Sequence, residues 1–158
     1  MAGNNQNLGS MFGEDMATAS LMVGLSFGNA GVGAVHALAY PLGAKFHIPH
    51  GVSNALLLPF VIKWNTLSCL DQFVEMSTAL STPVSQDDDA EAIADKVIEQ
   101  LHNLCTTVGI PKGLHSVGIK KQDIAELATE AIKVERLLRN NPRRLSVSDI
   151  EQIYQEAF

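Results

Sequence analysis

The stretch Gly31–Leu58, GVGAVHALAYPLGAKFHIPHGVSNALLL, decides how this chain folds and what chemistry it can carry. It places two histidines, His36 and His50, fourteen residues apart. His36 lies in a segment of small apolar residues, and His50 stands between a proline and a glycine just before a second apolar segment. Because a neutral imidazole is a common transition-metal ligand, a histidine inside one helix and another at a helix entrance predict part of a metal site. Two ligands alone do not close such a site.

Each histidine in the sequence also has an ordinary structural interpretation. His36 can be a hydrogen-bonded core histidine, and His50 can cap backbone groups at a helix entrance; the spacing alone leaves both interpretations open. His47 lies in an expected loop three residues before His50, where it can support a ligand or face a substrate. We expect His102 and His115 to lie on the solvated surface.

The composition is typical of one globular domain, since 46% of the 158 residues are hydrophobic and 18% are charged. The formal net charge of -6 argues against a nucleic-acid or anionic membrane partner. Cys69 and Cys105 form no CxxC pair, so we expect reduced thiols. No basic segment precedes an apolar run at the start, and residues 30–42 are too short and too interrupted to cross a membrane. These features predict a soluble, cytoplasmic protein.

Helical periodicity and capping signals predict an all-α domain of six or seven helices at residues 13–158, after a flexible segment at residues 1–12. We expect Pro41 and Gly43 to end the second helix, Pro59 to kink or interrupt the third, and Ser146 to cap the last. No segment shows the alternation of a strand. The expected helices are 14–31, 32–42, 51–65, 69–80, 90–108, 122–139 and 147–157.

The stretch at residues 31–59 resembles the carboxy-terminal signature of the iron-containing (group III) alcohol dehydrogenases. The family pattern is approximately G-x-x-H-x-x-A-H-x-L-G-x-x-x-x-x-P-H-G-x-x-N-A-x-L-L-P, and the chain matches nearly every fixed position. The resemblance continues outside this stretch, in FGNAG before it and in VGIP, VGIKKQDI and NNPRRLSVSDIEQIYQEAF after it.

This resemblance implies a reaction and a set of roles. Family members join an amino-terminal α/β domain, which binds NAD or NADP, to a carboxy-terminal all-α domain, and the active site lies between them. A divalent metal, iron or zinc, is held by one aspartate and three histidines, two of which match His36 and His50. Phe27 matches a position near the cofactor. Tyr40 stands where the family usually has a histidine, and Tyr40 and His47 are the candidate catalytic groups of the cleft.

The resemblance begins inside the family's helical domain, so the nucleotide-binding domain and the other two metal ligands have no counterpart in these 158 residues. We therefore expect a fragment of an oxidoreductase that interconverts alcohols with aldehydes or ketones and that does not turn over alone. A non-catalytic helical interaction or oligomerisation module is the alternative, and a homo-oligomer is expected in either case. The substrate alcohol, the choice of NAD over NADP and the choice of iron over zinc are left open.

Overall fold

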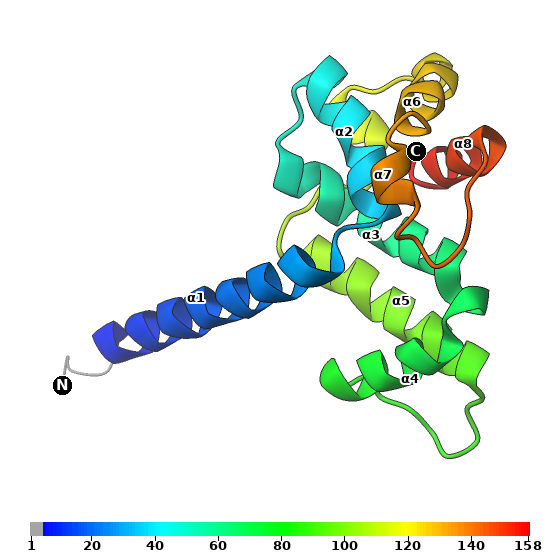
Figure 1. Cartoon of the computed structure of the whole chain (residues 1–158). Coiled ribbons are helices and arrows are strands. Elements are labelled where there is room, and N and C mark those ends of the chain that lie inside the picture. Colours follow the sequence, from blue (N-terminus) through cyan, green and yellow to red (C-terminus); the bar gives the residue numbers. More distant parts are fainter. Residues whose placement is uncertain (1–4) are drawn as a thin grey trace. The chain divides into compact units, whose positions relative to one another are not determined.

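The computed structural model describes the backbone of residues 5–158 and the side chains of residues 13–158. The chain divides into two compact units, residues 1–32 and residues 33–158, and each is described by itself (Figure 1). Over the described residues, the secondary structure consists of eight α-helices and three short 3-10 helices, with no strand. The all-α prediction is confirmed, with one helix more than the sequence predicted.

The first unit contains a single long helix, α1 (Asn5–Ala30). The helix expected at residues 14–31 is therefore present, and it begins earlier than expected, at Asn5, within the segment predicted to be flexible. Extending an existing helix adds one hydrogen bond for each residue fixed, and this stretch contains no proline to stop it. Residues 1–4 of the predicted flexible segment lie outside the described residues.

The second unit contains the other seven α-helices. Its 3-10 helices are η1 (Thr66–Ser68), η2 (Leu114–Val117) and η3 (Lys121–Asp123). Its α-helices are α2 (Ala34–Phe46), α3 (His50–Asn65), α4 (Leu70–Ala79), α5 (Ala90–Thr107), α6 (Ile124–Ala131), α7 (Glu135–Leu138) and α8 (Val147–Glu156).

The two prolines inside α2 and α3 do not end these helices, contrary to the prediction for Pro41. Helix α2 continues past Pro41 to Phe46 and ends at His47, a left-handed residue (φ 56°) whose N–H donates to the Gly43 carbonyl at 3.1 Å. Pro59 likewise lies within α3. Both prolines are buried, so the packing of their helices compensates for the backbone hydrogen bond that each proline removes.

The helix expected at residues 122–139 is broken into α6 and α7. Residues 132–134 form a turn, and the Leu137 N–H donates to the Val134 carbonyl at 3.1 Å. The β-branched Ile132 and Val134 in this turn are weaker helix formers than their neighbours. The change of direction lets both Leu127 of α6 and Leu137 of α7 reach the core, at 1% and 2% exposure.

The core of the second unit lies where α2 packs on α3 and α6, and α8 packs on α3 and α6. At its centre Tyr154 is fully buried and donates a hydrogen bond from its hydroxyl to the Leu38 carbonyl at 2.6 Å. Helices α4 and α5 lie side by side (Figure 1) and enclose a cluster that includes Phe73 and Val97. The predicted cap of α8 is confirmed, because the Ser146 hydroxyl accepts from the Asp149 N–H at 3.2 Å.

The segment after α7 is fastened to the end of α3 by a buried pair of amides. Asn65 donates to the Asn141 Oδ1 at 2.9 Å, and Asn141 donates to the Asn65 Oδ1 at 2.7 Å. Asn141 also donates to the Arg143 carbonyl at 2.7 Å, and the Arg143 guanidinium lies 4.3 Å from the centre of the Trp64 ring. This pairing holds the chain segment that follows the α6–α7 turn.

Within the described residues, no individual helix combines the length and apolar character that crossing a membrane requires. The pair Gly13–Ala30 and Ala34–Phe46 meets these criteria only when its two helices are taken together, which is weak evidence for a membrane segment.

Candidate metal centre

The connection between α2 and α3 brings the two predicted ligands together. It is three residues long, and its Ile48 is buried. His36 comes from the first turn of α2 and His50 from the first residue of α3, and their ring centres lie 5.4 Å apart with the planes inclined by 60°. Two imidazoles that bind one ion at tetrahedral angles, with nitrogens at 2.0–2.1 Å from it, have ring centres roughly 5 Å apart. The spacing of His36 and His50 therefore fits two ligands of one metal ion.

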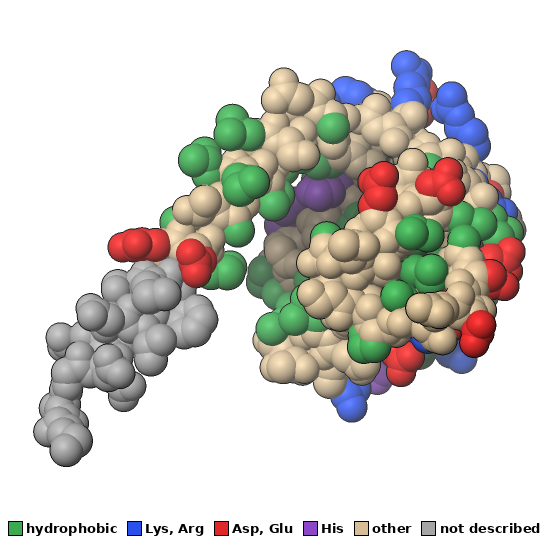
Figure 2. Space-filling model, turned by 90° about the horizontal axis from the view of Figure 1, so that it is seen from below, with side chains coloured by type: hydrophobic (Ala, Val, Ile, Leu, Met, Phe, Trp, Pro, Cys, Tyr) green, Lys and Arg blue, Asp and Glu red, His purple; other side chains and the backbone are tan. Residues whose placement is uncertain are grey.

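Tyr40 joins the two histidines in a cluster of three rings. It follows His36 by four residues, so both side chains lie on the same face of α2. Its ring centre lies 6.0 Å from that of His50, and 44% of the residue is exposed. Figure 2 shows histidine side chains, in purple, reaching the surface of the second unit on the face turned to the viewer. Tyr40 and His50 are exposed and His36 is half-buried, so the ring cluster is open to a ligand.

The surroundings of His36 favour its neutral form. Burial lowers the pKa of His36, and the positive charge that His50 can carry lowers it further. A metal competes with protons for the imidazole nitrogen, so a lowered pKa leaves that nitrogen free to bind at neutral pH.

Asn54 contacts His50 one turn further along α3. Its amide nitrogen Nδ2 lies 3.1 Å from the His50 Nε2 and donates to the His50 carbonyl at 2.9 Å. Its other amide atom, Oδ1, is buried and has no hydrogen-bond partner among the described residues. The sequence pattern did not predict this contact of Asn54 with the histidine ring.

A complete metal site needs more ligands than the second unit provides. Among the described side chains, no group of three or more His, Cys, Asp or Glu residues is placed to hold a metal ion. The two histidines of the ring cluster are therefore fewer ligands than a closed metal site needs.

The remaining predicted site residues lie apart from the ring cluster or in the other unit. His47 is exposed, and its side chain makes no hydrogen bond or ring contact with a described residue. Phe27 belongs to α1 in the first unit and is 51% exposed. Their predicted roles beside substrate and cofactor stay predictions.

Of the two histidines expected on the surface, one is placed differently. His102 is half-buried and packs edge-on against Phe60, with ring centres 5.0 Å apart. Burial lowers the pKa of His102, and the nearby Lys63 ammonium lowers it further. The prediction of a solvated His102 is wrong because α5 turns this side chain toward α3. His115 is exposed as expected, and its Nδ1 contacts the Phe158 carbonyl.

A groove of about 700 Å³ opens beside the ring cluster. It lies between α2 and the α6 region, and Tyr40 lines it together with the apolar Pro41, Leu127 and Val134. The ion pair between Lys45 and Glu126 also lines the groove. No sequence pattern indicated it, because its walls come from segments more than eighty residues apart.

Comparison with known proteins gives the family. Residues 2–158 match the model of the Fe-containing alcohol dehydrogenase family, C-terminal. Long-chain-alcohol dehydrogenase 1 of Geobacillus thermodenitrificans is 43% identical over 144 residues, which are 91% of this chain and 36% of that enzyme. Lactaldehyde reductase of Escherichia coli K12 is 35% identical over 146 residues, or 92% of this chain and 38% of that enzyme. The chain thus spans less than two fifths of the length of these relatives.

Solved structures agree with this relationship. The alcohol dehydrogenase from Oenococcus oeni superposes with a TM-score of 0.88 and 32% identity, over 99% of this chain and 40% of that one. A crystal structure of 1,3-propanediol oxidoreductase gives a TM-score of 0.85 and 35% identity, over 90% of this chain and 37% of the other. The chain belongs to the iron-containing alcohol dehydrogenase family and corresponds to its C-terminal helical domain.

Proposed function

We propose that this chain supplies half of the metal site of an NAD(P)-dependent alcohol dehydrogenase, with His36 and His50 as two of the ligands. The observation that carries the proposal is the 5.4 Å separation of these rings, which come from two different helices. The name of one relative, the NAD-dependent methanol dehydrogenase of Bacillus methanolicus, supports a nicotinamide cofactor. We propose iron or zinc as the metal, because nitrogen and carboxylate ligands suit both.

The chemistry requires more than these two side chains. When bound, a divalent metal polarises the alcohol oxygen, and the nicotinamide accepts the hydride. The role of His36 and His50 is to present two neutral nitrogens from rigid helices. The other ligands and the nicotinamide pocket lie, in this proposal, in parts of the enzyme outside these 158 residues. The chain alone is therefore expected to show no alcohol oxidation.

Tyr40 and His47 are the proposed cleft-lining groups. The hydroxyl of Tyr40 can donate a hydrogen bond to a substrate oxygen and so orient an alcohol or aldehyde. His47, exposed at the end of α2, is proposed to face substrate, and Phe27 to contact the cofactor.

The proposal is tested by titrating the 158-residue chain with Zn²⁺, with heat and histidine NMR signals as readouts. We expect weak binding that shifts the signals of His36 and His50 and that falls at least tenfold in His36→Ala and in His50→Ala. The double variant His102→Ala, His115→Ala is the matched control, because it removes two histidines away from the ring cluster. Binding that is equal in all variants, or robust NAD-dependent turnover by the chain alone, would overturn the proposal.

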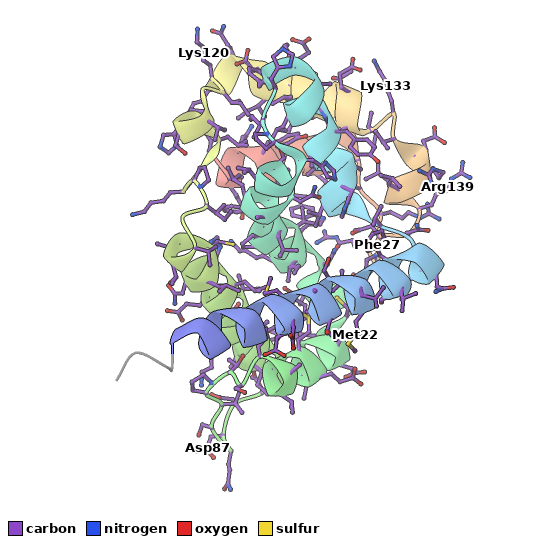
Figure 3. The ribbon with its side chains drawn as sticks, turned by 90° about the vertical axis from the view of Figure 1, so that its left-hand side faces the viewer. Met22, Phe27, Asp87, Lys120, Lys133 and Arg139 are labelled. Atoms are coloured by element: carbon purple, nitrogen blue, oxygen red, sulfur yellow. The ribbon has the colours of Figure 1, made fainter. Side chains whose placement is uncertain are left out.

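A second candidate function, a helical interaction or oligomerisation module, is favoured by the apolar side chains of α1. Its described residues include Met16, Leu21, Met22 and Phe27, each more than half exposed. Figure 3 labels Met22 and Phe27, and Figure 2 shows further apolar side chains, in green, on this helix. Exposed apolar clusters of this kind mark association surfaces in soluble proteins.

The proposed metal-site function and the oligomerisation function are distinguished by whether the measured effect depends on metal. A homo-oligomer formed through α1 dissociates on dilution with or without a chelator, and Met22→Ser shifts it toward monomer. Sedimentation velocity over a hundredfold concentration range measures this. A monomer at every concentration would remove the second candidate.

A further inference from the structure

The side-chain amide of Asn54 has an orientation that the structure fixes. One of its two ends lies 2.9 Å from the His50 carbonyl oxygen. A carbonyl oxygen can only accept a hydrogen bond, so the end facing it is the Nδ2 donor and not the Oδ1 acceptor. The opposite orientation would place two acceptors against each other.

The same nitrogen faces the His50 ring. Nδ2 lies 3.1 Å from the Nε2 of His50, and an amide nitrogen has no lone pair with which to accept. Nε2 must therefore be the acceptor of this contact, which requires it to carry no proton. In a neutral imidazole the single proton then resides on Nδ1.

This arrangement leaves the oxygen of the Asn54 amide unpaired within the described part of the chain. Oδ1 of Asn54 is buried without a hydrogen-bond partner among the described residues. Leaving a buried acceptor unpaired is unfavourable, so the two contacts of the donor end decide the orientation.

We infer that Asn54 is a positioning residue that holds His50 in the Nδ1–H form and so keeps an unprotonated Nε2 that a cation can bind in place of the Asn54 hydrogen bond. This inference rests on the proposed metal site. Free histidine side chains favour the Nε2–H form, in which that nitrogen would first have to lose a proton before it could bind a metal. Nε2 has one lone pair, so an ion that binds there takes the place of the Asn54 hydrogen bond and displaces no proton.

The tautomer is measured directly by two-bond ¹H–¹⁵N NMR of the ¹⁵N-labelled chain at pH 8 with a chelator. We expect His50 to show a protonated Nδ1 and an unprotonated Nε2, and the Nε2–H form to become the major one in Asn54→Leu. Leucine is close to asparagine in shape and is a better helix former, so α3 is retained. Asn103→Leu, on the exposed face of α5, is the matched control and should leave the His50 signals unchanged.

An Nε2–H form of His50 in the wild-type chain would overturn the inference even if the variant failed to fold. An Nδ1–H form that persists in a folded Asn54→Leu would overturn it as well. Addition of Zn²⁺ to the same samples separates this inference from the proposed function. If His50 has the expected tautomer but Zn²⁺ leaves its signals unmoved, the metal site fails and the role of Asn54 in setting the tautomer is supported.

Discussion

The amide pair between Asn65 and Asn141 is a buried polar contact whose removal should destabilise residues 33–158. Both residues are only 8% exposed, and each amide donates to the other, at 2.9 and 2.7 Å. Asn141→Ala leaves both ends of the Asn65 amide without their partner. A buried polar group left unpaired costs about 1–3 kcal/mol, so we expect a loss of about 3 kcal/mol in the free energy of unfolding.

Urea unfolding of the chain, followed by far-UV circular dichroism and by the fluorescence of Trp64, measures this loss. Trp64 is the only tryptophan and precedes Asn65 directly, so its fluorescence reports on the same region. The matched control is Asn103→Ala, an exposed asparagine on α5, which should change the stability by less than about 0.5 kcal/mol.

The double variant Asn65→Ala, Asn141→Ala tests the physical reason. It removes both amides at once, so no unpaired partner remains, and its loss should be smaller than the sum of the two single losses by at least about 1 kcal/mol. Losses that add within about 0.5 kcal/mol would refute the reasoning, because they would show that the two amides act independently.

Three further predictions concern stability, each measured by urea unfolding. Tyr154→Phe removes the hydroxyl that donates to the Leu38 carbonyl at 2.6 Å and should cost about 1–3 kcal/mol; no loss would mean that water satisfies the carbonyl. Gly113→Ala places a Cβ 2.9 Å from the Phe158 carbonyl oxygen and should cost about 1–3 kcal/mol, whereas an unchanged midpoint would show that the C-terminal segment yields freely. Folding lowers the pKa of His102, so the unfolded state binds more protons and stability should fall as the pH drops below about 6.5. His102→Gln should flatten that slope, and an equally steep slope in the variant would contradict the assignment.

Local signals in the sequence were sufficient for much of the fold. The cap at Ser146 was predicted correctly because it acts between residues three apart. The prediction for Pro41 failed because burial of α2 against α3 and α6 outweighs the cost of a proline, and that burial depends on segments distant in sequence. The break between α6 and α7 was missed for the same reason, since both sides of the turn are fixed by the core.

The candidate site, like the fold, has features that the sequence predicts and features that depend on how distant segments pack. The pairing of His36 with His50 was predicted from their positions in the sequence, and the short connection between two helices brings their rings together. The contact of Asn54 with the His50 ring depends on side-chain orientation, which spacing alone does not give. The groove beside Tyr40 depends on α6, a helix more than eighty residues further along the chain.

The number of ligands in the ring cluster determines what the rest of a metal site would have to provide. The ring cluster contains two histidines and no carboxylate, and burial, together with the charge that His50 can carry, lowers the pKa of His36. Neutral imidazoles donate lone pairs to a divalent cation, but two of them leave most of its coordination positions unfilled. Binding of this unit to metal by itself must therefore be weak, however well the rings are spaced. Tight binding requires further ligands from outside the ring cluster, so the metal would join this helical domain to the part of the enzyme that carries them.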